Sequence, residues 1–148
     1  MSSFGNHRTT PSEGCILSRL RSVGLRPTRQ RIALGELLFA QGARHVSAEE
    51  LHEEAIRAKV PVSLATIYNT LHQFTAAGML REVAVESSKT YFDTNTHDHH
   101  HMFIEGEERV VDVPLDAVVL KDTPDVPDDY EVVRVDVVVR VRRKTDLV

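Results

Sequence analysis

The sequence predicts an α+β fold made of a helical N-terminal part and a small, strand-rich C-terminal part. Apolar residues recur at helical spacing up to Gly78 and alternate at strand spacing after it. The charge changes too, because residues 1–44 hold seven Lys or Arg against two acids, whereas the remainder holds eleven against twenty. We therefore expect three segments: a disordered arm at 1–12, a first domain at 13–94 and a second domain at 95–148.

The composition limits the class of protein. Hydrophobic residues make up 41% and charged residues 27%, which is ordinary for a soluble globular protein. No apolar run is long enough to span a membrane and no secretory leader is visible, so we expect a cytoplasmic protein with no membrane partner. The single cysteine, Cys15, excludes an internal disulfide, and we interpret it as a small buried residue of a helix. The basic N-terminal part favours a polyanionic partner.

Two helices are expected first, one from Glu13 to Gly24 and one from Pro27 to Gly42. Each has apolar residues spaced for burial on one face: Ile16, Leu17, Leu20 and Val23 in the first, and Ile32, Leu34, Leu37, Leu38 and Phe39 in the second. The capping box 47–50 opens a third helix, which ends before Pro61. Its inward-facing residues are expected to be Leu51, Ala55 and Ile56.

A fourth helix is expected from Ser63 to Gly78, with a mixed character that suits DNA. Apolar residues spaced for burial occupy one side: Leu64, Ile67, Leu71 and Phe74. The opposite side carries hydrogen-bonding groups and no acid: Ser63, Thr66, Asn69 and Gln73, with Tyr68 and His72 beside them. A helix with such a face is suited to the major groove of DNA.

The remaining elements are strands. A hairpin is expected from 80–85 and 90–93, which completes a winged helix-turn-helix. Further strands are expected at 102–104 and 110–113, and the clearest one runs through the alternating valines of 133–141. A short helix is compatible with residues 115–120. Because a lone valine-rich edge strand is unstable, we expect it to pair with other strands, across a two-fold axis.

The run 97–101 contains four histidines and predicts a metal or haem site, since neutral imidazole nitrogen is a good ligand for transition metals and haem iron. Strand-like segments on both sides favour a folded site over an exposed loop or a purification tag. Neighbours on a strand face opposite ways, so adjacent histidines are not expected to share one site. The haem candidates are His99, His100 and His101, and the choice between haem and Fe(II), Mn(II) or Zn(II) stays open.

These segments together resemble the ferric uptake regulator family, over Leu17 to Val141. The similarity is carried by Gly24–Arg31, His45, Ser47–Leu51, Ser63–Tyr68, Tyr91–Asp93 and the histidine cluster. Within the family the chain is most similar to the iron response regulator subgroup, at Tyr68–Leu71, Lys89–Asn95, the triple histidine and Val135–Arg140. The resemblance implies a winged-helix DNA-binding domain followed by a small α/β dimerisation domain.

The resemblance also implies two sets of functional residues. A metal site would draw ligands from both domains: His45, Asp93, His99, His101 and Asp112. Such an ion would fix the angle between the domains, and so the spacing of the two recognition helices in a dimer. The implied DNA contacts are Arg26 in the minor groove, Arg29 and Arg31 on phosphates, and Ser63, Thr66, Tyr68, Asn69 and Gln73. Asn69 stands where an arginine is common, which favours pairing with adenine.

Three departures from the family change what is expected. The chain lacks the Cys-x-x-Cys pairs of most members, so no four-cysteine structural zinc is expected. A second family site corresponds to Asp98, His100, Val119 and Arg134, and valine and arginine are not metal ligands. The Cys-Pro haem motif of some relatives is absent, because Ile16 follows Cys15.

We therefore expect an iron- or haem-responsive regulator that binds palindromic operator DNA as a homodimer or larger oligomer and represses genes when iron is scarce. A haem-delivering protein would be a further partner. The alternatives are a Fe(II)-, Mn(II)- or Zn(II)-sensing repressor without haem and a metal- or haem-buffering protein that binds no DNA. An enzyme is not expected, because the chain has no His-Glu-x-x-His spacing, nucleophile elbow or phosphate loop.

Overall fold

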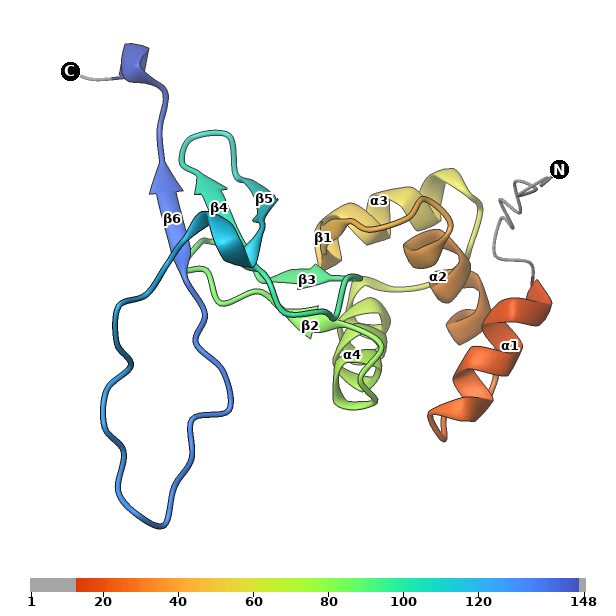
Figure 1. The fold of residues 1–148 in the computed structure, drawn as a ribbon. Coiled ribbons are helices and arrows are strands. Elements are labelled where there is room, and N and C mark those ends of the chain that lie inside the picture. Colours follow the sequence, from red (N-terminus) through yellow and green to blue (C-terminus); the bar gives the residue numbers. More distant parts are fainter. Residues whose placement is uncertain (1–12, 147–148) are drawn as a thin grey trace, which may run out of the picture. The chain divides into compact units, whose positions relative to one another are not determined.

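The computed structural model describes residues 13–146, which divide into two units (Figure 1). The first comprises the described residues up to Val83 together with Lys89–Thr96, and the second comprises Ala84–Ser88 and the described residues from His97 onward. The turn between the two strands of the expected hairpin therefore belongs to the second unit. The expected arm at 1–12 lies outside the described residues.

The first unit contains four helices and one small sheet. The helices are α1 (Glu13–Ser22), α2 (Arg29–Phe39), α3 (Ala48–Arg57) and α4 (Leu64–Ala76). The strands β1 (His45–Ser47), β3 (Tyr91–Asp93) and β2 (Arg81–Glu82) lie side by side in that order, all antiparallel. Sequence reasoning predicted the four helices and the hairpin but missed β1, because three residues are too few to show strand alternation.

Three of the helices begin at a hydroxyl cap. In each, the side-chain oxygen accepts a hydrogen bond from the backbone N–H three residues on: Thr28 from Arg31, Ser47 from Glu50 and Ser63 from Thr66. These bonds satisfy N–H groups that have no partner inside the helix. At the other end of α4, Gly78 has a φ of 83°, a left-handed conformation that favours glycine and ends the helix.

The core of the first unit is built from the apolar faces of all four helices and the sheet. Its largest fully buried members are Ile16, Leu20, Leu34, Leu38, Leu51, Ile67, Leu71, Phe74, Met79, Leu80 and Phe92. Two burial predictions were wrong: Ile56 is 61% exposed, and Cys15 is exposed. Each follows or precedes a buried residue by one position, and one step around a helix turns a side chain by about 100°, away from the buried stripe.

The second unit is built on β4 (His100–Ile104), which lies between two partners. It pairs antiparallel with β5 (Arg109–Val113) and parallel with β6 (Val138–Val141). The single-turn 3₁₀ helices Leu115–Ala117 and Lys144–Asp146 follow β5 and β6. Among the described residues, no helix has the length and apolarity needed to cross a membrane.

The valine-rich strand is shorter than predicted. Only Val138–Val141 pairs with β4, and the preceding valines belong to a long connection that runs from the first 3₁₀ turn to β6 (Figure 1). The reason is that β4 offers β6 only the backbone of His101–Ile104, and alternation without a partner backbone does not make a strand. The helix considered at 115–120 is reduced to one 3₁₀ turn.

Candidate metal centre and nucleic-acid interface

In the second unit, two histidines and one aspartate converge at the start of β4. His99 and His101 point to the same face, with ring centroids 4.6 Å apart. Asp112 on β5 is the register partner of His101, and its Oδ1 lies 2.9 Å from His99 Nε2 and 3.6 Å from His101 Nε2. The possible ligand atoms of these three side chains lie within 4.8 Å of one another. Two imidazoles and one carboxylate are a donor set that Zn(II), Fe(II) and Mn(II) accept.

A backbone contact decides which nitrogen of His99 is available. His99 Nδ1 lies 2.5 Å from the carbonyl oxygen of His97, which accepts hydrogen bonds only, so Nδ1 carries the proton. A neutral ring then presents the lone pair of Nε2 to the Asp112 carboxylate, and two acceptors repel at that distance. A proton or a metal ion between the two groups would relieve this repulsion. Orientation by a backbone carbonyl is typical of metal-binding histidines.

His100 faces the other way, as strand alternation predicts. Its Nδ1 accepts a hydrogen bond from the backbone N–H of Val137 at 3.3 Å, and the residue is only 4% exposed. Nε2 of the neutral ring therefore carries the proton, and no lone pair is left for iron. Of the three haem candidates, His100 thus has a structural role, because its ring joins β4 to Val137, the residue before β6.

In the first unit, a histidine and an aspartate face each other across two strands. His45 on β1 is the register partner of Asp93 on β3, and His45 Nε2 lies 3.2 Å from Asp93 Oδ2. The other oxygen of Asp93 accepts a hydrogen bond from the N–H of Asn95 at 2.8 Å. Asp93 is 1% exposed, and a buried carboxylate needs a cation or donors around it.

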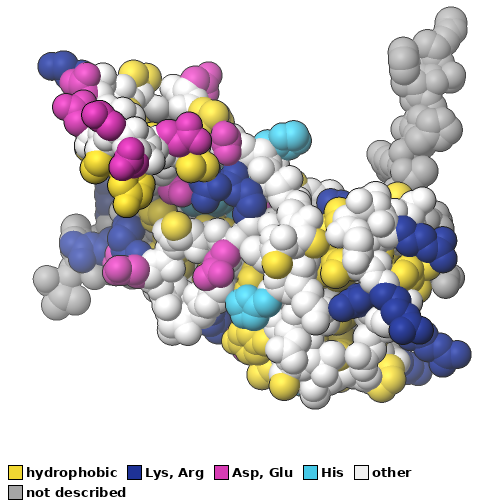
Figure 2. All heavy atoms as spheres, turned by 90° about the horizontal axis from the view of Figure 1, so that it is seen from below, with side chains coloured by type: hydrophobic (Ala, Val, Ile, Leu, Met, Phe, Trp, Pro, Cys, Tyr) yellow, Lys and Arg dark blue, Asp and Glu magenta, His cyan; other side chains and the backbone are white. Residues whose placement is uncertain are grey.

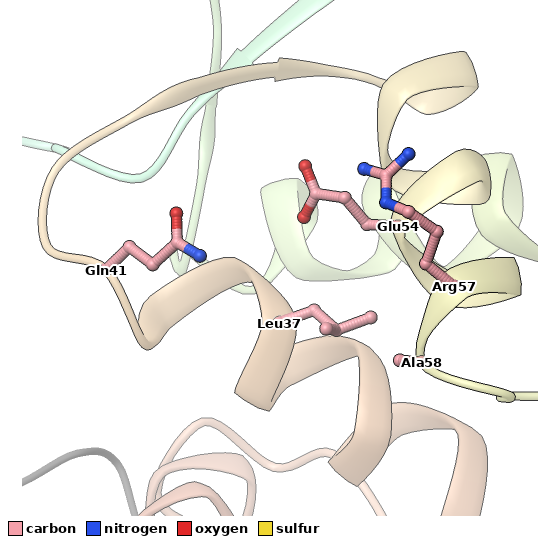
Figure 3. Close-up of a pocket in the computed structure, with 5 residues that line it drawn as sticks. All are labelled: Leu37, Gln41, Glu54, Arg57 and Ala58. Atoms are coloured by element: carbon pink, nitrogen blue, oxygen red, sulfur yellow. The ribbon is translucent and has the colours of Figure 1, made fainter.

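An ion pair fixes the start of β1. The Arg44 guanidinium donates to both oxygens of Glu54 on α3, at 2.9 and 2.5 Å, and to the Leu37 carbonyl on α2. The hydrogen bond to Glu54 raises the pKa of Arg44, while burial acts in the opposite direction. Beside it, α2 and α3 flank a hollow of about 500 Å³ into which Glu54 and Arg57 project (Figure 3). Sequence reasoning missed this pair, because neither residue belongs to a periodic pattern.

The start of α2 and the outer face of α4 form one polar surface in the first unit. A hollow of about 300 Å³ is lined there by Thr28, Gln30, Arg31, Thr66, Asn69, Thr70 and Gln73. The structure thus brings four of the predicted DNA contacts together: Arg31, Thr66, Asn69 and Gln73. None of the lining residues is acidic. Figure 2 shows Lys and Arg side chains over the first unit, and many Asp and Glu side chains with Lys and Arg among them over the second.

The other predicted DNA contacts have different roles in the structure. Arg26 and Arg29 are exposed, and Ser63 is the cap of α4 and donates to the Thr66 hydroxyl. Tyr68 is half-buried, and its hydroxyl donates to the Glu49 carboxylate at 2.6 Å. That hydrogen bond raises the pKa of Tyr68 above its ordinary value, with a smaller contribution from burial. Glu49 was missed, since only the fold places α3 beside this tyrosine.

Comparison with known proteins identifies the family of this chain. Residues 22–140 match the ferric uptake regulator family. The peroxide-responsive repressor PerR of Staphylococcus epidermidis is 37% identical over 97 residues, 65% of this chain and 63% of the relative. The ferric uptake regulation protein of Bordetella parapertussis is 35% identical over 83 residues, 56% of this chain and 60% of the relative. The match thus spans less than two thirds of these relatives.

Two solved structures have the same fold. The ferric uptake regulator from Pseudomonas aeruginosa, determined with manganese, has a TM-score of 0.65 and 25% identity, over 87% of this chain and 98% of the other. The Vibrio cholerae ferric uptake regulator has a TM-score of 0.67 and 23% identity, over 86% and 98%. They confirm the predicted α+β fold with an N-terminal winged helix-turn-helix. The family match over most of its length shows that this chain belongs to the ferric uptake regulator family.

Proposed function

We propose that this protein is a transcriptional regulator that responds to a divalent metal ion and binds palindromic operator DNA as a homodimer. The observation that carries the metal is the convergence of His99, His101 and Asp112, whose possible ligand atoms lie within 4.8 Å of one another. The family assignment favours a regulator over an enzyme. The polar, acid-free surface of α2 and α4 supports DNA as the partner.

The proposed site takes ligands from both units. His99, His101 and Asp112 would supply three, and His45 with Asp93 would supply two more. Nitrogen and oxygen donors of this kind suit Fe(II), Mn(II) and Zn(II), and zinc would be favoured in vitro whatever the physiological ion. An ion held by both sets of ligands would bias the equilibrium between arrangements of the units, and so the spacing of the two α4 helices on a duplex.

The proposed DNA contacts lie on α4, just before α2 and at the start of α2. Thr66 and Asn69 would contact base edges in the major groove, with the ring of Tyr68 beside a thymine methyl. The exposed Arg26 would reach the minor groove and Arg29 a phosphate, so affinity should fall steeply with salt.

The proposed dimer is supported by apolar residues on the second unit. Several side chains of its long connection are strongly exposed, among them Val119 (86%), Tyr130 (70%) and Val133 (87%). Large apolar residues gathered on one segment are typical of a surface that another chain covers. A second copy is the proposed partner, since a palindromic operator requires two-fold symmetry.

The test is operator binding with and without metal. Fluorescence anisotropy would follow a labelled duplex, selected from genomic fragments, with metal-free protein and with Mn(II), Zn(II) or anaerobic Fe(II). We expect one or more ions to change the affinity at least ten-fold, and His99→Ala to abolish that response. His52→Ala is the matched control, because His52 lies on α3 and is not among the five proposed ligands. Metal binding without any DNA binding would instead indicate a metal-buffering protein.

Haem is the second candidate effector. If haem is the effector, the protein would belong to the iron response regulator subgroup, repress genes when iron is scarce and receive haem from a delivering protein. It is supported by the three consecutive histidines. His99 and His101 are 9% and 7% exposed, so axial ligation through them would require the surrounding residues to open. A Soret titration of the wild type, His99→Ala and His100→Ala tests it. Loss of the haem spectrum only in His99→Ala, with lower operator affinity on haem addition to the wild type, is the expected result.

A further inference from the structure

The guanidinium of Arg31 is held by two other segments of the first unit. Gln73, near the end of α4, accepts two hydrogen bonds through Oε1, from Arg31 Nε at 3.3 Å and Nη2 at 2.9 Å. The remaining nitrogen, Nη1, donates to the carbonyl oxygen of Arg26 at 2.8 Å. All three nitrogens are therefore engaged, and the plane of the guanidinium is fixed relative to α2, α4 and the segment before α2.

This geometry changes the role expected of Gln73. Glutamine recognises adenine by accepting from one base nitrogen and donating to another, so it needs its side-chain oxygen. Here that oxygen is already engaged with Arg31. Gln73 is therefore unsuited to reading a base in this arrangement.

The same geometry leaves Arg31 suited to one anion. A second N–H on each terminal nitrogen is not used by the contacts to Gln73 and Arg26. Arg31 lines the hollow at the junction of α2 and α4, where its charge is surrounded by hydroxyls and amides such as Thr28, Thr66 and Asn69. A fixed guanidinium in a hollow without acids suits a phosphate oxygen, and a held side chain loses less entropy on binding than a free one.

We infer that Gln73 is a positioning residue that orients Arg31 toward a phosphate of the DNA backbone and does not itself read a base. The inference rests on the proposed function, because it names how one contact of that DNA complex is made. Gln73 would raise affinity for every operator sequence to the same degree, since phosphates carry no sequence information.

The test compares Gln73→Met, which keeps the length of the side chain but lacks the acceptor, with Gln41→Met, the same change at an exposed glutamine that does not line this hollow. Anisotropy titrations would use the operator, operators altered at each base pair, and a series of salt concentrations. We expect Gln73→Met to lower affinity roughly five-fold on all sequences. Arg31→Ala should cost on the order of thirty-fold and reduce the salt slope by about one. Gln41→Met should have little effect.

A double variant separates positioning from direct contact. If Gln73 acts through Arg31, adding Gln73→Met to Arg31→Ala should cost no further affinity. A Gln73→Met loss confined to one base pair, or one that persists fully in the Arg31→Ala background, would overturn the inference while the proposed function stands. A lower free energy of unfolding with unchanged DNA affinity would overturn it too, as a purely structural role. Wild-type protein that binds no duplex at low salt in any metal state would overturn both.

Discussion

Backbone contacts favour opposite tautomers on two neighbouring histidines, His99 just before β4 and His100 at its start. His99 donates through Nδ1 to a carbonyl and offers Nε2, whereas His100 accepts through Nδ1 and carries its proton on Nε2. One ring is prepared to be a ligand and the next one is not. The alternation of a strand thus explains why three consecutive histidines supply two donors to the same face.

Nitrogen-15 NMR of labelled histidine checks this directly. In metal-free protein at a pH where the rings are neutral, we expect His99 as the Nδ1–H tautomer and His100 as the Nε2–H tautomer, because each follows its backbone partner. Addition of Zn(II) should move the Nε2 resonance of His99 and leave both nitrogens of His100 near their starting shifts. Zinc-induced shifts on His100 with none on His99 would contradict the assignment of the ligand face.

Tyr68 provides a second check at this scale. Its pKa is raised above the ordinary 10.0, chiefly because the neutral phenol donates to Glu49 and the phenolate loses that bond. The bond therefore contributes stability below pH 10 and loses it as the pH rises through the folded-state value. Glu49→Gln should return the pKa of Tyr68 toward 10.0 in a carbon-13 NMR titration of the tyrosine rings.

At the scale of elements, the capped helices carry the surface proposed to meet DNA. Ser63 closes the first turn of α4 with its side-chain oxygen and also lies among the residues expected to contact DNA. Its hydroxyl is therefore involved in folding before any ligand arrives. The cap and the DNA contact are separable, because an aspartate caps a helix as well as a serine does but carries a negative charge.

Two substitutions at Ser63 use that difference. Ser63→Ala should lower the free energy of unfolding by about 1 kcal/mol, as expected for a lost cap, and reduce DNA affinity only modestly. Ser63→Asp should unfold like the wild type in urea and yet bind DNA far more weakly, since the carboxylate faces phosphates. Equal DNA affinity for Ser63→Asp and the wild type would place this end of α4 away from the duplex.

Helices were predicted well here because their signals are local. The caps at Thr28, Ser47 and Ser63 and the apolar spacing of α4 are written within single segments of the chain. Strand lengths were predicted less well. β6 extends only as far as β4 offers backbone partners, and β1 is a strand only because β3 lies beside it. Pairing partners far apart in sequence leave no local pattern.

The same distinction applies to the site. The structure brings Asp112 close to His99 and His101, and His45 close to Asp93, and the family resemblance had named these five residues as metal ligands, which stays a prediction. The contacts of Gln73 with Arg31 and of Glu49 with Tyr68 were not foreseen. Each joins side chains from different helices, so only the packing of α4 against its neighbours reveals it.

For the whole molecule, the proposed ion would couple the stabilities of the two units. A ligand that binds only the folded chain stabilises it by about 2.7 kcal/mol at a free concentration one hundred times its Kd. We expect Mn(II) to raise the melting temperature of the wild type and of His52→Ala, and to raise that of Asp112→Asn and His45→Ala much less. An unchanged metal-induced shift in His45→Ala would confine the ion to the ligands of the second unit.

The path of the chain between the units has its own mechanical consequence. The backbone passes from one unit to the other between Val83 and Ala84, returns between Ser88 and Lys89, and crosses again between Thr96 and His97. The short segment Ala84–Ser88 is held in the second unit by two hydrogen bonds: the Glu86 carbonyl accepts from Arg140, and the Ser87 hydroxyl donates to Glu108. After a single proteolytic cut between Thr96 and His97, the two fragments should therefore elute together until denaturant releases Ala84–Ser88 from the second unit.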